Sequence, residues 1–591
     1  MPRFTIASEV ETNRATPAGV RTDGRFMSRV LARVPFLAAR AQGLGFAPAA
    51  LIVALVASIN FLANLGYPAA PIWDESYYLT AVARYEERIA QFASHPALGL
   101  QLITAGDVLL HPNRKLDTRS IGWDKKVAGD QLPKGYSFAG VRLMPGVFGA
   151  LGAVAFFALM YVLTQSVIAA LAFSNLYVFE NALIVHFRAA QLDPFQIAFV
   201  LATLLCFAVS ARRGGRSSPG VDALYGASCG FACMAKLNAS VLAFMGLMLI
   251  VRRIGIGWRT SPRLKLLLVG ARDGLLMTGG CFAAIALIAT LHVALNPIAP
   301  IAASPAGHKD LGFVTPVYAA YLHRERGLSP AVVLDASKDY LNFMFADLKG
   351  VPKTDPNGSK PLVWPLMRGT INYRWDSTGN RTAYVQLAGN PVGWYLGLVA
   401  LVASAWLVLS WTWQAARRAI GAQAPQPVSA PRGKGAEVRR AKGASAPRTK
   451  TSGPPRVKAA APAAAAASTE AAVGLTRSRS DPARRALIVM LLAQWLVYMS
   501  VHAYIGIERV MYLYHYFIAL MISWCLVPLV FAEAAERWPA LRARQVPILA
   551  GMAVLLWAGF IFYAPLTFHW YLTHDQCEWR NVLQHIVTCN K

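Results

Sequence analysis

Long apolar segments separated by short polar ones fill most of the chain from residue 44 onward. A helix needs about 20 apolar residues to cross the hydrocarbon layer of a bilayer, and about eleven segments approach that length. They are Leu44–Gly66, Leu143–Leu163, Val167–Ile184, Phe195–Ser210, Val221–Ala235, Ser240–Val251, Leu275–Leu295, Val392–Trp413, Ala486–Val501, Met511–Phe531 and Ile548–Phe562. The pattern predicts an all-α integral membrane protein of about eleven transmembrane helices, with outside-facing loops and a short amphipathic helix on the soluble outer side.

Basic residues are concentrated in alternate loops, which predicts the orientation of the helices because loops rich in Lys and Arg stay cytoplasmic. The N-terminus would be inside and the tail after Pro565 outside. This topology treats Val221–Val251 as two short helices hinged at Lys236, although one long helix fits the hydropathy nearly as well. The predicted cytoplasmic loops are Arg212–Arg216, Arg252–Lys265, about 417–485 and Arg537–Arg544.

The predicted organisation follows from these segments. It comprises a cytoplasmic tail at 1–43, a transmembrane domain at 44–295 with a first outside loop at 67–141, a second outside loop at 296–390, a transmembrane helix at 391–414, a basic loop at 415–485, transmembrane helices at 486–566 and an outside tail at 567–591. The basic loop is rich in Ala, Pro, Lys and Arg, so it is predicted to be disordered. It would act as a solvated linker attracted to anionic lipid, with a binding role left open.

Composition supports the membrane assignment and narrows the chemistry. Hydrophobic residues make up 55% of the chain and charged residues 15%, while the formal net charge is +28. In a soluble protein such a charge would suggest nucleic acid, but here it lies in loops between apolar runs, so topology explains it and no nucleic-acid partner is expected. The 7 cysteines contain no CxxC pair, which argues against a zinc or iron–sulfur module.

Two of the cysteines, Cys577 and Cys589, lie in the predicted outside tail. An oxidising compartment allows them to form a disulfide. The apolar positions of Glu578–Thr588 have near-helical spacing, but a full helix would hold the sulfurs apart, because bonded cysteines need Cα atoms within about 7 Å. The stretch must then bend, and the alternative is two free thiols.

Adjacent carboxylates stand just after the first predicted span, in the sequence Pro71-Ile72-Trp73-Asp74-Glu75-Ser76-Tyr77-Tyr78. A carboxylate at a membrane surface can accept a proton from an attacking hydroxyl or bind a metal. The alternative is that Asp74 and Glu75 only cap the helix that follows.

A motif about twenty residues further on gives this pair a context. The sequence His95-Pro96-Ala97-Leu98-Gly99-Leu100-Gln101, together with Asp74 and Glu75, resembles the first outside loop of the protein O-mannosyltransferase family, which belongs to the C-type glycosyltransferase superfamily. This chain departs from the family at Ala97 and at Leu100, where the family has proline and lysine. Similar motifs follow in the family's order at Arg142–Gly146, Arg188 with Leu192–Asp193, Ala235–Leu237, Gly389–Val392 with Trp394, and Arg509–Tyr516.

The resemblance implies an enzyme that transfers mannose from a polyprenyl phosphate to Ser or Thr hydroxyls of secreted or membrane proteins, with inversion. It places the catalytic machinery in the transmembrane domain 44–295, on the periplasmic or extracellular face of the plasma membrane. No cofactor is firmly indicated, and a divalent cation is left open. The implied roles are Asp74 and Glu75 for catalysis, Arg142, Lys236 and Arg188 for the donor phosphate, and His95, Arg509 and His515 for substrate.

Charge placement supports part of this assignment independently. Lys236 and Arg142 lie at helix ends predicted to face outside, where a cation is costly unless it meets an anion. The alternatives are that they snorkel to lipid headgroups, that Arg188 pairs with Asp193, and that Arg509 pairs with Glu508.

Length and missing motifs define the competing functions. The second outside loop, Asn296–Asn390, is too short for the β-trefoil domain of the fungal and animal enzymes, so the compact bacterial branch is more similar. The nearest alternative function is a glycosyltransferase of the same superfamily that modifies a lipid or polysaccharide, such as the aminoarabinose transferases acting on lipid A. A transporter or flippase is less favoured because no repeated halves are present, and no nucleotide-binding motif appears.

Overall fold

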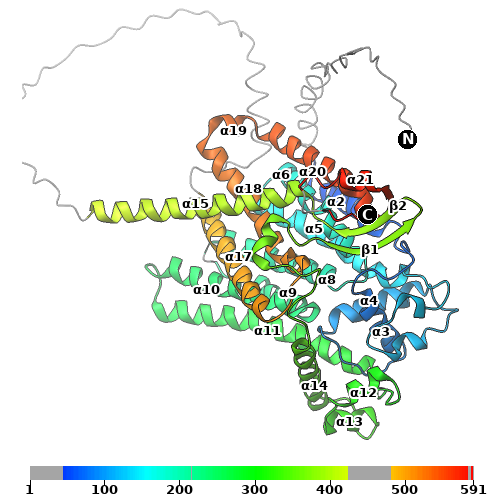
Figure 1. The fold of residues 1–591 in the computed structure, drawn as a ribbon. Coiled ribbons are helices and arrows are strands. Elements are labelled where there is room, and N and C mark those ends of the chain that lie inside the picture. The colour runs from blue at the N-terminus through cyan, green and yellow to red at the C-terminus, as the bar shows by residue number, and fades with distance from the viewer. Residues whose placement is uncertain (1–43, 215, 423–480, 584–586, 590–591) are drawn as a thin grey trace, which may run out of the picture.

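The computed structural model describes residues 44–214, 216–422, 481–583 and 587–589, and helices dominate it (Figure 1). The predicted tail 1–43 and most of the predicted loop 415–485 lie outside these residues. The helices of the bundle are α2 (Phe46–Leu62), α5 (Ala139–Thr164), α6 (Val167–Val178), α7 (Asn181–Phe187), α8 (Asp193–Arg212), α9 (Pro219–Ala235), α10 (Ala243–Gly257), α11 (Arg263–Leu295), α15 (Pro391–Ala422), α17 (Pro482–Glu508), α18 (Phe517–Arg537) and α20 (Gln545–Thr567).

Shorter elements connect these helices, and most of them belong to residues 67–138 and 296–390. We call the side of the bundle that carries these two segments the outer side. The shorter elements are α3 (Glu75–Glu86), α4 (Leu98–Leu110), η1 (Arg119–Trp123), η2 (Gly129–Gln131), η3 (Leu237–Leu242), α12 (Pro305–Leu311), α13 (Pro316–Leu322), α14 (Pro330–Lys349), η4 (Pro361–Leu366), β1 (Ile371–Thr378), β2 (Arg381–Leu387), η5 (Leu513–Tyr516), α19 (Pro539–Ala543), β3 (Tyr571–Thr573) and α21 (His574–Glu578).

The prediction of a helical multi-pass membrane protein is confirmed. In the described part of the chain, 8 helices are long and apolar enough to span a membrane, or 9 if the bent pair α6 and α7 is one span. Every predicted span falls on a bundle helix, but α2 and α9 have only 17 residues each. The count of about eleven is therefore not confirmed.

Two breaks in the bundle helices carry polar residues. The axes of α6 and α7 differ by 61°, and Glu180 at this break caps α7 by accepting a hydrogen bond from Ala182 N. Lys236 lies between α9 and η3 with extended backbone angles of φ −152° and ψ 134°. The hinge predicted at Lys236 is thus present, and the single long helix is not.

Close helix packing depends on small side chains. A Cβ atom at Gly226 of α9 would lie 1.8 Å from the carbonyl oxygen of Met277 in α11. Only glycine allows these two backbones to meet, as is common where helices pack inside a membrane.

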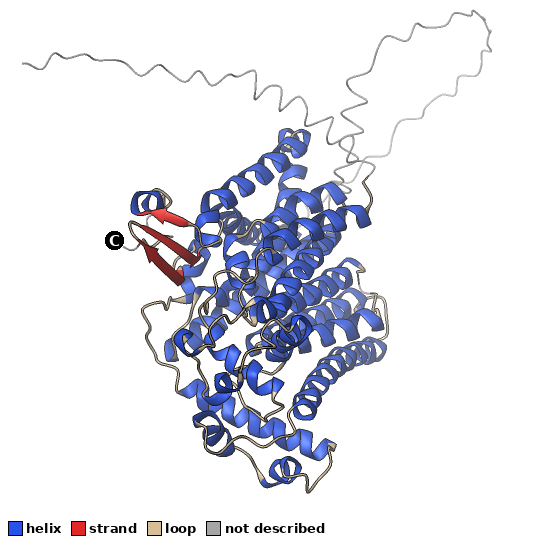
Figure 2. Cartoon of the chain, turned by 90° about the vertical axis from the view of Figure 1, so that its right-hand side faces the viewer, coloured by secondary structure: helices blue, strands red, loops and turns tan. Residues whose placement is uncertain are grey.

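A small antiparallel sheet, which the sequence did not predict, lies on one flank of the bundle (Figure 2). The strand order is β1-β2-β3. Ile371 pairs with Leu387, and an irregularity between Asn372 and Arg374 shifts the register. Strand β3 pairs with β2 through Arg381 and Thr573, so residues far apart in the chain form one sheet.

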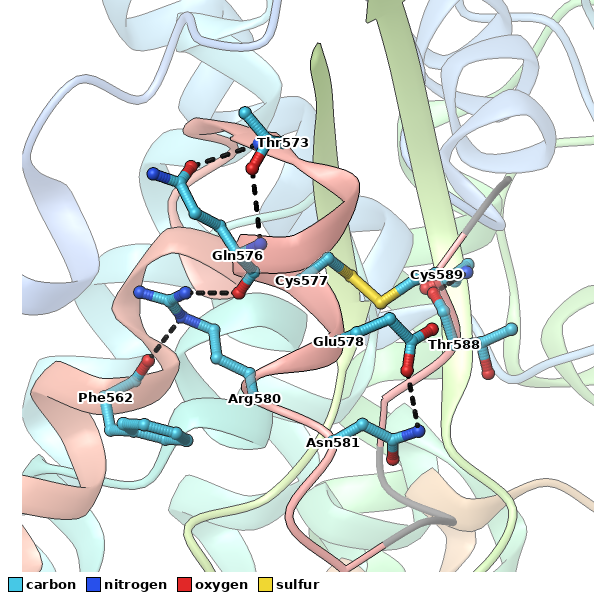
Figure 3. Close-up of a disulfide and its surroundings, with 10 residues drawn as sticks. Phe562, Thr573, Gln576, Cys577, Glu578, Arg580, Asn581, Thr588 and Cys589 are labelled. Carbon is cyan, nitrogen blue, oxygen red and sulfur yellow. Dashed lines mark hydrogen bonds between the residues drawn. A yellow bond between two sulfur atoms is a disulfide. The ribbon is translucent and has the colours of Figure 1, made fainter. Parts of the chain in front are cut away.

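The predicted disulfide between Cys577 and Cys589 is confirmed, with Cα atoms 6.0 Å apart (Figure 3). Helix α21 ends at Glu578, and the described residues 579–583 contain no helix. The chain bends here as the cysteine geometry requires, so the described residues between the two cysteines form no continuous helix. Asn372 Nδ2 donates a 3.1 Å hydrogen bond to the carbonyl oxygen of Thr588, which ties the tail to β1.

Candidate active site

Asp74 stands between a strained residue and the start of α3. Trp73 has a φ of +53°, in the left-handed region that few non-glycine residues adopt. The Trp73 ring stacks on Tyr373 at 5.0 Å and meets Tyr512 edge-on at 5.7 Å. Asp74 occupies the N-cap position of α3, but its side chain makes no capping hydrogen bond. Helix capping therefore does not account for Asp74.

The carboxylate of Asp74 has no bonding partner among the described residues. Burial raises its pKa to about 6, the positive charge of Lys236 opposes this rise, and the negative charge of Asp193 adds to it. A carboxyl group with this pKa is largely ionised at neutral pH yet still basic enough to accept a proton. Asp74 is thus equipped to act as a general base.

Glu75, in contrast, is fully bonded. Arg142 Nε and Nη2 each donate a 2.8 Å hydrogen bond to its two carboxylate oxygens, and both side chains are 0% exposed. Ala190 N adds a 2.7 Å hydrogen bond to Glu75. Arg142 also donates to the carbonyl oxygens of Pro68 and Ala70, each at 2.8 Å.

This pairing does not support two roles that the sequence suggested. Arg142 donates into the protein from Nε, Nη1 and Nη2, so it does not present a free guanidinium to a donor phosphate. Glu75 has both oxygens occupied, so it does not fit the holding of a cation. The pair instead fixes the loop that carries Asp74 against α5.

Lys236 is held by a chain of hydrogen bonds that leads to the sheet. Its Nζ lies 2.7 Å from Asp193 Oδ2, and His186 Nε2 lies 2.7 Å from the same oxygen. His186 Nδ1 is 2.6 Å from the Tyr373 hydroxyl. Lys236 Nζ also lies 4.9 Å from the centre of the Tyr514 ring. Asp193 therefore orients Lys236, and Tyr373 and His186 orient Asp193.

Four residues predicted from the sequence line one cavity. His95, Lys236, Arg509 and His515 surround a space of about 280 Å³ between the first outer loop, η3 and the start of α18. The polar side chain of Asn238 joins them. The cavity gathers positive and neutral nitrogen donors, the chemistry that suits an anionic group.

Different hydrogen bonds position the two histidines of this cavity, His95 and His515. Burial, helped by the charge of Lys236, lowers the pKa of His95 to about 3, so its ring is neutral at physiological pH. The Tyr340 hydroxyl donates a 2.7 Å hydrogen bond to the carbonyl oxygen of His95. His515 Nδ1 lies 3.2 Å from Tyr512 N, which positions its ring.

The guanidinium of Arg509 has a hydrogen-bond donor without a partner in the described structure. Burial lowers the pKa of Arg509, and its buried Nε has no hydrogen-bond partner among the described residues. The pairing of Arg509 with Glu508, considered above, is wrong because Glu508 pairs with Lys353 at 3.3 Å. An unpaired buried N–H is costly unless a ligand accepts its hydrogen bond.

Arg188 lies outside the cavity. It donates to the carbonyl oxygen of Asn60 at 3.3 Å, and its guanidinium lies 5.0 Å from the centre of the Phe568 ring. Both the predicted phosphate contact and the predicted pairing with Asp193 are unsupported. The pairing fails because Arg188 follows the end of α7 while Asp193 begins α8, so the two residues do not share a helix turn.

Metal binding was left open by the sequence. The described ranges contain no group of three or more His, Cys, Asp or Glu side chains arranged to hold a metal ion. A divalent cation, which the sequence left open, therefore remains untested.

Sequence reasoning did not find His186 or Tyr373. His186 precedes Asp193 by seven residues, but the break between α7 and α8 hides their contact from any helical spacing. Tyr373 reaches the site through the strand register, and its alternation with the polar residues Asn372 and Arg374 is the sequence signal of that strand.

Comparisons with known proteins bear on this geometry. The family model of dolichyl-phosphate-mannose-protein mannosyltransferase matches residues 51–287, which include Asp74, His95, Asp193 and Lys236. Over this segment the chain is similar to that family. It is a membrane glycosyltransferase of the polyprenyl-phosphate-mannose type. No curated protein matches the sequence.

A solved structure shares the fold of this mannosyltransferase. The Saccharomyces cerevisiae protein O-mannosyltransferase Pmt1-Pmt2 complex bound to the sugar donor is 11% identical with a TM-score of 0.67, covering 93% of this chain and 94% of that one. The apo oligosaccharyltransferase of Archaeoglobus fulgidus is 10% identical with a TM-score of 0.40, and the match covers 91% of this chain and 58% of that one.

Proposed function

We propose that this mannosyltransferase moves mannose from a polyprenyl phosphate to Ser or Thr hydroxyls of secreted or membrane proteins, with inversion at the sugar. The outer side defined above would face the periplasm or the extracellular space across the plasma membrane. The observation that carries the proposal is the unpaired, half-buried carboxylate of Asp74 within electrostatic reach of Lys236.

The reaction needs a base for the acceptor and cations for the leaving phosphate. The acceptor oxygen attacks the anomeric carbon while Asp74 takes the hydroxyl proton, and the bond from that carbon to the phosphate oxygen breaks. The polyprenyl phosphate leaves with one more negative charge, and the proton remains on Asp74. A single displacement of this kind inverts the anomeric centre.

Lys236 and Arg509 are our proposed ligands of the donor phosphate. Lys236 brings a charge already oriented by Asp193, and Arg509 brings a buried Nε that lacks a partner in the described structure. Preorganised charge at a developing oxyanion stabilises the transition state by several kcal/mol in a water-poor site. His95 and His515 would position the sugar or the acceptor within the same cavity.

The direct test uses the purified chain in liposomes with radiolabelled polyprenyl-phosphate mannose and a Ser/Thr-rich peptide. We expect Asp74→Asn to lower the transfer rate by ~10²–10⁴, and Arg509→Ala to weaken donor binding. The matched control is Asp117→Asn, an exposed outer-loop carboxylate that pairs only with Arg119 among described residues. Near-normal transfer by Asp74→Asn, or transfer to a lipid acceptor in preference to the peptide, would contradict the proposal.

A further inference from the structure

A large cavity opens on the lipid-facing surface between α10 and α17, away from the candidate active site. Its volume is about 570 Å³. Leu247 and Val251 of α10 form one wall, and Val489 and Met490 of α17 form the other. Leu247, Val251 and Val489 are exposed in the described structure, so the space faces the surroundings of the bundle and not its core.

The cavity sits at the end of these helices opposite to the active site. Helix α10 follows Lys236 and runs away from it toward Gly257, while α17 begins at Pro482 and runs toward Arg509. The α17 wall lies near the helix end remote from Arg509, and the α10 wall extends from Phe244 to Arg252, which lies at the end of the cavity remote from Lys236. On the predicted topology this is the cytoplasmic boundary of the bilayer.

Two pairs of adjacent arginines, Arg252-Arg253 and Arg484-Arg485, lie at this boundary. In each pair one arginine forms salt bridges and the other does not. Arg253 pairs with Asp222 at 2.7 Å and with Asp273 at 2.6 Å. Arg484 pairs with glutamates of α18, Glu533 at 3.0 Å and Glu536 at 2.6 Å. One arginine of each pair is thus buried and neutralised inside the protein.

The other member of each pair, Arg252 or Arg485, lines the cavity. Arg252 Nη1 donates a 2.8 Å hydrogen bond to the carbonyl oxygen of Ala211, and the guanidinium of Arg485 lies 5.2 Å from the centre of the Trp411 ring. Neither forms a salt bridge within the described ranges, and the nearby Asp481 pairs with Arg212 at 3.2 Å.

We propose that this cavity binds an anionic phospholipid of the cytoplasmic leaflet. Its acyl chain would lie between Leu247 and Val489, and its phosphate would meet Arg252 and Arg485. An apolar groove that ends in two guanidinium groups without a salt bridge in the described ranges matches a lipid with an apolar tail and a negative headgroup. Arginine suits this role because its planar fork binds phosphate oxygens in pairs.

The test is native mass spectrometry of the full chain, titrated with phosphatidylglycerol and, separately, with phosphatidylcholine. We expect the wild type to bind phosphatidylglycerol more tightly. Arg252→Gln or Arg485→Gln should each weaken that binding about fivefold, with a larger loss in the double variant. Arg418→Gln, an exposed arginine of α15, is the matched control and should bind normally.

A second variant separates lipid binding from folding. Val489→Trp fills the apolar part of the cavity from a lipid-facing position while both arginines remain, and it should also reduce phosphatidylglycerol binding. Equal binding of the two lipids, or unchanged binding in the double variant and in Val489→Trp, would overturn the proposal. Displacement of phosphatidylglycerol by an equimolar polyprenyl phosphate would overturn the assigned occupant, because the cavity would then take the donor lipid.

Discussion

Arg142 and Glu75 meet through two parallel hydrogen bonds of 2.8 Å, in a position where neither side chain contacts solvent. Removal of one partner from such a pair leaves an uncompensated buried charge, which destabilises a protein by about 3–5 kcal/mol. We therefore expect Arg142→Gln to reduce both the yield of folded protein and its unfolding temperature. Size-exclusion profiles and thermal unfolding in detergent measure this, with Arg119→Gln in the exposed pair with Asp117 as control. If Arg142→Gln has normal stability but weakened donor binding, Arg142 contacts the donor phosphate after all.

Asp74 gives a prediction in which activity and stability move in opposite directions. Its pKa is raised from 3.8 to about 6 by burial, so the folded state binds a proton more tightly than the unfolded state. The ionised form is destabilising by roughly 3 kcal/mol above pH 6, and this effect disappears below pH 4. Asp74→Asn should then unfold at a higher temperature than the wild type at pH 7.5 while being inactive, and the difference should vanish toward pH 4.

The same pKa sets the pH dependence of transfer in the wild type. A general base must be ionised, so kcat/KM should fall about tenfold per pH unit below pH 6 and level off above it. Initial rates from pH 4.5 to 8 at constant ionic strength measure the profile. A flat profile across pH 6 would exclude Asp74 as the base.

Lys236 and Asp193 can be tested as a coupled pair. Lys236→Ala should lower transfer because the leaving phosphate loses a cation, and it should lower stability because Asp193 keeps only His186 as a partner. Adding Asp193→Asn removes the unpaired charge, so the double variant should regain stability without regaining transfer. If transfer recovers together with stability, Lys236 has only a structural role.

The disulfide anchors the tail at the sheet and gives a prediction of its own. Cys577→Ser should free residues 587–589 from β1 and lower stability by about 3 kcal/mol in the chain-entropy model. Hydrogen exchange of the β3 segment and unfolding with and without reductant measure this. The double variant with Cys589→Ser should be insensitive to reductant, and a wild type that is equally insensitive would argue against the bond.

The sequence predicted the helical framework better than the polar contacts, for physical reasons visible at single residues. The hinge at Lys236 was predictable because a cation inside a continuous membrane helix is costly, although hydropathy alone fits one long helix nearly as well. The role of Arg142 was not, because charge at a helix end shows the need for an anion but not whether Glu75 or a substrate supplies it. Strand β1 was missed although residues Ile371–Asp376 alternate apolar and polar side chains and a two-residue turn with Gly379 leads into β2, which together are the sequence signals of a hairpin. Only β3 comes from a distant segment, so its pairing with β2 has no local signal.

The pairing of β2 with β3 also has a consequence for biosynthesis. Strand β3 follows α20, so it reaches β2 only after every described bundle helix has been translated. Until then β2 presents an open edge, and unpaired edges invite association with other chains. A chain that ends before Tyr571 would have its described membrane helices complete but the edge of β2 unpaired. Such truncated chains should therefore associate with other chains more readily than the full chain does.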